Sequence, residues 1–235
     1  MKLICFPFAG GSSLAFRGWG TSLGVEVIAA SLPGREARSG EPLHTRMEPL
    51  VADLVERLAP KVTGTYALYG HSMGGRIAFA FTRELARRGL PGPVQLIISG
   101  TGAPHLPRRV PSIHAEPEPV LVARLRAFGG TPQAVLDEPE LLAYFLPILR
   151  ADLAVAETYR VDAHDTVSCP ILAISGTEDP FANREEVEAW ATLTTSRCEA
   201  QFFPGGHFFI DTQRPALFAL VRRALAAGTR NPPTG

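Results

Sequence analysis

The stretch Gly70-His71-Ser72-Met73-Gly74 decides the fold class of this chain, because it has the form G-x-S-x-G between a strand pattern and a helix pattern. Residues 65–69 are β-branched and aromatic, which predicts a strand, and a long helical pattern begins at residue 73. A serine on a tight turn between a strand and a helix is typical of a nucleophile elbow, whose strained backbone lifts the hydroxyl toward a substrate. Such a turn requires small flanking residues, and Gly70 and Gly74 meet that requirement.

Composition and charge exclude several classes of function. The chain has 235 residues, of which 46% are hydrophobic and 20% charged, as in a single globular domain. Its formal net charge of zero argues against nucleic acid as a partner, because phosphate binding requires a basic excess. No apolar run approaches membrane-spanning length and the N-terminus is not typical of a signal peptide, so we expect a cytoplasmic protein without a membrane partner. The three cysteines lack metal-ligand spacing and predict neither zinc nor a disulfide framework.

Short apolar runs alternate with helical patterns along the chain. Strands are expected at residues 3–6, 25–30, 65–69, 94–99, 170–175 and 199–203. Helices are expected at residues 13–22, 46–59, 73–89, 184–193 and 214–227. Because the strand runs are almost continuously apolar, they predict a sheet that is covered on both faces. We therefore expect one α/β domain over residues 1–235, with a mostly parallel, doubly wound sheet.

One interval between strands is much longer than the others. Between residues 99 and 170 the chain has a proline-rich loop and two helical patterns, at 120–128 and 140–159. Long inserts near a site are often functional, so we predict a lid over about residues 104–165. A helical hairpin packed on the sheet edge is the alternative. The tail, about residues 228–235, is rich in Gly, Pro and Thr and is expected to fray.

A serine hydroxyl needs a base to accept its proton, and the base needs an acid to orient it. His207 follows the last predicted strand, at the carboxyl edge of the sheet where ligands bind in such folds. Asp179 follows the preceding strand and is the predicted acid, with Glu178 as the alternative. Asp179 is also compatible with an ordinary turn before Pro180. The predicted catalytic set is therefore Ser72, Asp179 and His207.

Acyl transfer also requires N–H donors that stabilise a developing oxyanion. Met73 follows the nucleophile, so its backbone N–H is expected to be one donor. The loop after the first strand is expected to provide the other, from Ala9 in preference to Phe8, because Gly10 and Gly11 permit close backbone approach. We expect no metal or other cofactor in this chemistry.

An ordered set of motifs covers nearly the whole chain. The segments are Phe6-Pro7-Phe8-Ala9-Gly10-Gly11, Leu32-Pro33-Gly34-Arg35-Glu36, Gly70-His71-Ser72-Met73-Gly74, Ala103-Pro104-His105, Gly129-Gly130-Thr131-Pro132, Leu149-Arg150-Ala151-Asp152 and Phe203-Pro204-Gly205-Gly206-His207-Phe208. This set resembles the type II thioesterases, the editing enzymes of polyketide and nonribosomal peptide synthesis, which have the α/β-hydrolase fold. The resemblance implies the same triad and a mobile helical lid inserted after the sixth strand of the standard hydrolase sheet. It also places Phe8 and Phe208 beside the substrate and the lid.

The resemblance further implies a reaction and a partner. The enzyme would hydrolyse acyl thioesters, with short or aberrant acyl groups, from the phosphopantetheine arm of acyl or peptidyl carrier proteins through an acyl-Ser72 intermediate. Arg108 and Arg109 are candidates for contact with an acidic carrier surface, and a solvated face is the alternative. We expect a monomer rather than an obligate oligomer.

Three other functions remain open at this point. They are a general carboxylesterase or lipase of the same fold, a product-releasing thioesterase, and an inactive module that binds a carrier protein. The complete predicted triad argues against the inactive module. A chain that starts at its first strand is expected to be free-standing, which argues against a product-releasing domain.

Overall fold

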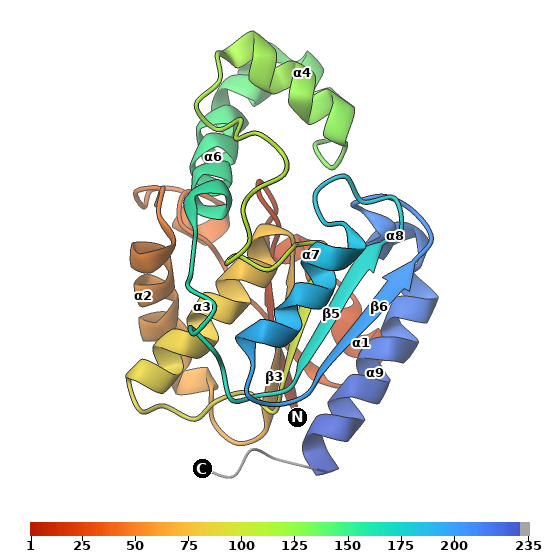
Figure 1. Cartoon of the computed structure of the whole chain (residues 1–235). Coiled ribbons are helices and arrows are strands. Elements are labelled where there is room, and N and C mark those ends of the chain that lie inside the picture. Colours follow the sequence, from red (N-terminus) through yellow and green to blue (C-terminus); the bar gives the residue numbers. More distant parts are fainter. Residues whose placement is uncertain (231–235) are drawn as a thin grey trace.

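Six parallel strands form a single sheet in the computed structural model, which describes residues 1–230 (Figure 1). The strands are β1 (Lys2–Phe6), β2 (Glu26–Ala29), β3 (Tyr66–His71), β4 (Gln95–Ser99), β5 (Ile171–Gly176) and β6 (Cys198–Phe203). Their order in the sheet is β2-β1-β3-β4-β5-β6, and every neighbouring pair is parallel. The α/β fold class is confirmed, and each predicted strand lies within two residues of its expected ends.

Helices cover both faces of the sheet. They are α1 (Trp19–Leu23), α2 (Met47–Leu58), α3 (Met73–Arg87), α4 (Glu118–Phe128), α5 (Gln133–Asp137), α6 (Pro139–Thr158), α7 (Arg184–Glu188), α8 (Phe209–Thr212) and α9 (Arg214–Arg230). Helices α2 and α3 pack on one face, and α1 and α9 pack on the other. This arrangement is the doubly wound sheet that the continuous apolar strands predict.

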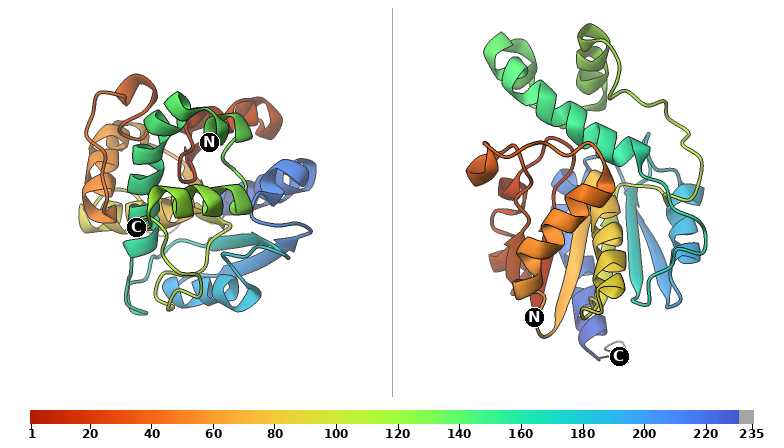
Figure 2. Two further views of the ribbon diagram at one scale, coloured as in Figure 1. Left: turned by 90° about the horizontal axis from the view of Figure 1, so that it is seen from above. Right: turned by 90° about the vertical axis from the view of Figure 1, so that its left-hand side faces the viewer.

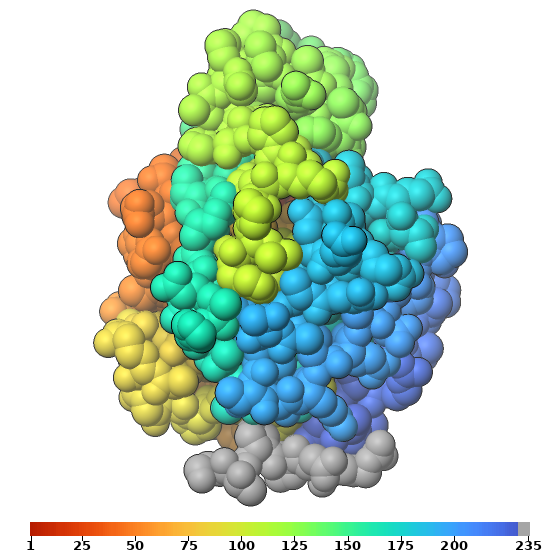
Figure 3. Space-filling view, in the orientation of Figure 1, coloured from red at the N-terminus to blue at the C-terminus, as the bar shows by residue number. Residues whose placement is uncertain are grey.

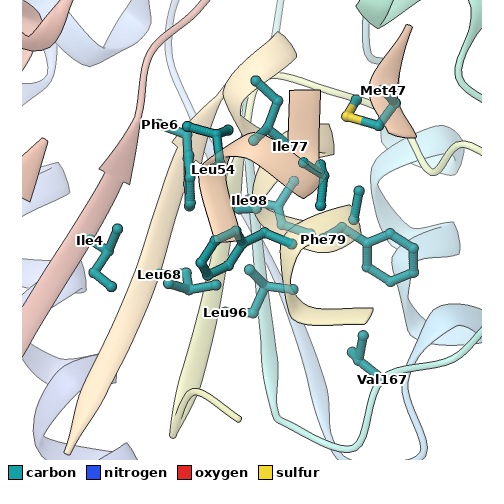
Figure 4. Packing of buried hydrophobic residues seen from close by; sticks show 14 of the residues in the cluster. Ile4, Phe6, Met47, Leu54, Leu68, Ile77, Phe79, Leu96, Ile98 and Val167 are labelled. Atoms are coloured by element: carbon teal, nitrogen blue, oxygen red, sulfur yellow. The ribbon is translucent and has the colours of Figure 1, made fainter. Parts of the chain in front are cut away.

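Successive residues of each strand contribute to two separate cores, because side chains alternate across a pleated strand. Leu68 of β3 packs toward α2 and α3, whereas its neighbour Tyr69 packs toward α1 and α9. Figure 4 shows Leu68 and Ile98 of the sheet in one buried cluster with Ile77 and Phe79 of α3. The strands are therefore apolar on both faces, which explains why their sequences do not alternate with polar residues.

The long interval between β4 and β5 folds into α4, α5 and α6 above the carboxyl ends of the strands (Figure 1). The view from above shows α4 and α6 over that edge (Figure 2), and the space-filling view shows the insert as the top of the molecule (Figure 3). The insert has a small core of its own, which includes Leu121, Leu125, Leu136 and Leu146. The alternative of a hairpin packed on the edge of the sheet does not fit this position.

Several helix boundaries differ from the sequence-based expectation. The expected helix at 13–22 is divided into a 3-10 turn (Ser13–Phe16) and α1, because Gly18 between them has a left-handed φ of 79°. Helix α9 continues to Arg230, so the first residues of the tail that was expected to fray are helical. Residues 231–235 of that tail lie outside the described residues. In the described part of the chain, no helix is long and apolar enough to cross a membrane.

We predict that Leu68→Ala lowers the free energy of unfolding by about 2–5 kcal/mol, since Leu68 is fully buried and the substitution leaves a cavity. Leu14→Ala is the matched control, because Leu14 is 60% exposed and its truncation changes stability by at most about 0.5 kcal/mol. Urea unfolding followed by circular dichroism measures both values. Equal effects of the two substitutions would contradict the core described above.

Candidate active site

Ser72 lies in a strained turn between β3 and α3. Its backbone has φ 56° and ψ −118°, a conformation that costs a non-glycine residue about 1–3 kcal/mol. A Cβ at Gly70 would overlap the backbone of Gly74, and a Cβ at Gly74 would overlap the Phe6 carbonyl. The Ser72 N–H donates to the Ser99 carbonyl at 2.7 Å, which ties the turn to β4. The turn therefore has the geometry of a nucleophile elbow, and its two glycines are sterically required.

His207 and Asp179 form a buried hydrogen-bonded pair in the loops that follow β6 and β5. His207 Nδ1 lies 2.9 Å from Asp179 Oδ2. Asp179 Oδ1 also accepts the Phe181 N–H at 2.9 Å, and Oδ2 accepts the Ser175 hydroxyl at 3.2 Å. Since a carboxylate can only accept, this geometry places the proton of a neutral His207 on Nδ1 and leaves Nε2 able to accept one. Glu178, the alternative acid, is exposed.

Ser72 and His207 line the same cavity, whose volume is about 150 Å³. No hydrogen bond joins the Ser72 hydroxyl to His207 among those of residues 1–230. Nucleophile–base contacts often tighten only when substrate is bound, so the missing hydrogen bond does not argue against the pair. The fold thus brings together the three residues that the sequence predicts as a triad, with the acid–base contact already formed.

Both predicted oxyanion donors also line this cavity. Met73 is the first residue of α3, so its N–H has no acceptor within the helix. Ala9 lies in the loop after β1, where the Gly11 N–H donates to the Phe8 carbonyl at 2.8 Å and closes a tight turn. Gly10 has φ 73° in that turn. The missing Cβ of residue 74 lets the first turn of α3 approach the Phe6 and Pro7 carbonyls at the end of β1.

His71, next to the nucleophile, contacts β4 rather than Ser72. It is fully buried, and its Nδ1 lies 3.0 Å from the Ser99 hydroxyl. Its ring centroid is 4.9 Å from that of His207. Burial, and to a smaller extent His207, lower the pKa of His71 well below its ordinary value of 6.5. His71 is therefore neutral and leaves His207 as the histidine with access to the cavity.

The insert forms much of the cavity wall. The ring centroids of Phe128 and Phe181 are 4.6 Å apart, which joins the end of α4 to the loop after Asp179. Gly130 touches the Phe208 ring so closely that a Cβ would overlap it. The Phe208 and Phe8 rings lie 5.3 Å apart at the same wall. Both aromatic residues expected at the substrate therefore line the cavity, and the insert covers it.

One polar residue of the cavity wall is not predicted from the sequence. Arg76, one helical turn after Ser72, lines the cavity and donates to the Thr101 hydroxyl at 3.0 Å and to the Ala156 carbonyl at 3.1 Å. Burial, followed by repulsion from nearby arginines, lowers its pKa to about 10. A charged residue four positions after the nucleophile, within an otherwise apolar helix face, is the signal that would have pointed to it.

Arg108 and Arg109, the candidates for carrier contact, also line the cavity. The Arg108 guanidinium lies 3.6 Å from Glu157 and its side chain is 21% exposed. Arg109 donates to the Pro180 carbonyl at 2.7 Å and is 48% exposed. Arg109 therefore has more surface available to a partner than Arg108. Within residues 1–230, no group of three His, Cys, Asp or Glu side chains is placed to hold a metal ion.

The comparison with known proteins identifies the class. The thioesterase domain family matches residues 1–225, and the chain belongs to this family and is a thioester hydrolase. Gramicidin S biosynthesis protein GrsT of Aneurinibacillus migulanus is 34% identical over 212 residues, covering 89% of this chain and 83% of the relative.

Solved structures agree with this assignment. The RedJ thioesterase of the prodiginine pathway in Streptomyces coelicolor has a TM-score of 0.89 and 38% identity, over 95% of this chain and 90% of that chain. YbtT, a type II thioesterase from the yersiniabactin NRPS/PKS pathway, has a TM-score of 0.87 and 31% identity, over 97% of this chain and 93% of that chain. The sequence resemblance to the type II thioesterases is thereby confirmed.

We predict that His71 makes the stability of the protein fall in mild acid. Because its pKa is lowered in the folded state, the unfolded chain binds the extra proton, so the free energy of unfolding falls as the pH drops below 6.5. Between pH 7.5 and 5.5 this residue accounts for a loss of about 1.4 kcal/mol. Urea unfolding at both pH values should show a correspondingly smaller loss for His71→Gln. His164→Gln, at an exposed position, should retain the wild-type dependence.

Proposed function

We propose that the protein hydrolyses short acyl thioesters on the phosphopantetheine arm of carrier proteins in nonribosomal peptide or polyketide synthesis. The observation that carries this proposal is that His207, hydrogen-bonded to the buried Asp179, lines the same cavity as Ser72. The printed descriptions of GrsT, RedJ and YbtT as proteins of such pathways support the carrier-bound substrate. The geometry supports the acyl-transfer chemistry, and the relatives support a carrier-bound thioester as the substrate.

In the proposed mechanism, Ser72 Oγ attacks the thioester carbonyl while His207 Nε2 accepts the hydroxyl proton. Asp179 keeps His207 in the required tautomer and stabilises the imidazolium that forms. The N–H groups of Met73 and Ala9 stabilise the oxyanion. The carbon–sulfur bond then breaks, and the imidazolium protonates the departing thiolate. Water attacks the acyl-Ser72 ester with His207 again as base, which releases the carboxylic acid and restores the serine. These steps use no metal or cofactor.

The size and cover of the cavity favour short acyl groups. A volume of about 150 Å³ is similar to that of a protein cavity that holds benzene. We infer that the insert acts as a lid, since Phe128 and Gly130 contact the loops that carry Asp179 and His207. A carrier-bound substrate would then require these contacts to open. Arg109 is the better of the two candidate arginines for the carrier surface, because it is the more exposed.

We predict that Ser72→Ala lowers kcat on acetyl- and propionyl-carrier thioesters by about 10⁴-fold or more, since it removes the nucleophile. The folded state should persist, and the free thiol released by each substrate can be followed with a chromogenic disulfide. Ser22→Ala, at an exposed serine of α1, is the matched control and should retain full activity. Efficient turnover of simple oxygen esters without activity on carrier thioesters would favour a general carboxylesterase instead. A preference for long, full-length products would favour a product-releasing thioesterase.

Asp179→Asn should reduce kcat on the same thioesters by about 10⁴-fold, because the amide favours the wrong histidine tautomer. Glu178→Gln tests the neighbouring alternative with the same chemical change, and we expect it to stay within about twofold of wild type because an exposed side chain is far less tightly coupled. Steady-state kinetics of the two purified variants, with their circular dichroism spectra compared first, separate the possibilities. A reversed order of effects would move the acid to Glu178.

A further inference from the structure

A buried ion pair connects the insert to the loop after β1, which contains Ala9, Gly10 and Gly11 and is called the Ala9 loop below. Arg35, in the loop after β2, and Asp152 of α6 are 7% and 5% exposed, respectively. Arg35 Nη1 donates to Asp152 Oδ2 at 2.6 Å and Nη2 donates to Oδ1 at 2.7 Å, so the contact is bidentate. This geometry is the strongest that a guanidinium and a carboxylate can adopt.

Both members of the pair also bind the backbone of the Ala9 loop. Asp152 Oδ2 accepts the Gly10 N–H at 2.8 Å, and Arg35 Nη1 donates to the Gly11 carbonyl at 2.9 Å. Leu149, one turn earlier on α6, lies so close to Gly10 that a Cβ there would overlap its side chain. The two residues after Ala9 are therefore held from one side by an ion pair and by an apolar contact.

This arrangement is hard to explain by stability alone. A buried ion pair loses solvation energy that its attraction rarely exceeds, so apolar residues of similar size often replace such a pair without loss of stability. The loop itself contains two adjacent glycines, and glycine has the least restricted backbone of any residue. Without the pair, the Gly10 N–H and the Gly11 carbonyl would lose their partners, and the loop would have other conformations available.

We propose that Arg35 and Asp152 are positioning residues that hold the Ala9 N–H toward the oxyanion. The proposal rests on the role of Ala9 in the proposed function. It also gives α6, the last helix of the insert, a part in the catalytic geometry, because Asp152 belongs to this helix. Neither side chain has to contact the substrate, since both act through the peptide groups of Gly10 and Gly11.

The test is the double substitution Arg35→Met with Asp152→Leu, which replaces the pair by apolar side chains of similar size. We expect this variant to fold, with a Tm within about 4 °C of wild type. Its kcat on propionyl-pantetheine should fall by about 10- to 100-fold, somewhat less than the 10²–10³-fold loss on removing one oxyanion donor outright. KM should change by less than about threefold, because the lost interaction belongs to the transition state. A double variant with a wild-type kcat overturns the proposal.

Asp152→Asn provides a second test if the double variant does not fold. Asparagine keeps an oxygen that can accept the Gly10 N–H, whereas Asp152→Leu does not. Measured well below each Tm, kcat per folded molecule should therefore decrease in the order wild type, Asp152→Asn, Asp152→Leu. Wild-type kcat values per folded molecule for both single variants would assign the pair a purely structural role and overturn the proposal.

A matched control comes from another arginine–aspartate pair. Arg38 Nη2 and Asp53 Oδ2 are 2.8 Å apart, and this pair joins the loop after β2 to α2. Asp53→Asn makes the same chemical change as Asp152→Asn, and we expect it to alter Tm while leaving kcat unchanged. A loss of kcat equal to that of Asp152→Asn would overturn the proposal.

The activity of Ser72→Ala separates a failure of this inference from a failure of the proposed function. If Ser72→Ala remains active, the proposed function itself is wrong. If Ser72→Ala is inactive and the Asp152 variants are fully active, only this inference is contradicted.

Discussion

The strained backbone at Ser72 is the constraint on which the rest of the site depends. Its positive φ exposes the hydroxyl only because both flanking positions are glycine and the turn is tied to β4 through the Ser99 carbonyl. The same glycine that relieves the turn, Gly74, lets the start of α3 touch the end of β1. One local conformation thus sets both the backbone geometry at Ser72 and the close approach of α3 to the loop after β1.

The parallel sheet collects the remaining groups at one edge. Because β3, β5 and β6 run in the same direction, the loops that carry Ser72, Asp179 and His207 all leave the sheet at its carboxyl end. Asp179 is buried with three hydrogen-bond donors around its carboxylate, which orient it toward His207. The base is consequently positioned by a network that belongs to the body of the fold rather than to the insert.

The insert covers the cavity from above, and its contacts with the rest of the molecule include two that differ in kind. Aromatic and glycine contacts at Phe128 and Gly130 reach the loops of the triad. Asp152 reaches the loop after β1 directly at the Gly10 N–H, and its ion-pair partner Arg35 reaches the same loop at the Gly11 carbonyl. The apolar contacts at Phe128 and Gly130 do not depend on a particular orientation of the groups. The bidentate pair of Arg35 and Asp152, in contrast, requires one specific geometry.

The sequence by itself determined the strands and the doubly wound α/β class, and it predicted the triad candidates with Glu178 as an alternative acid, because each is carried by a local signal. Apolar runs mark strands, glycines mark the strained turn at Ser72, and Asp179 and His207 each follow a strand end. The division of the first helix at Gly18, which has a left-handed φ, and the extension of α9 to Arg230 were not predicted, since helix ends have weak sequence signals. Only the tertiary structure decided that Asp179 rather than Glu178 pairs with His207, and that Asp152 reaches Gly10, 142 positions away. Contacts between distant residues depend on where whole elements pack, and no local pattern in the chain specifies that.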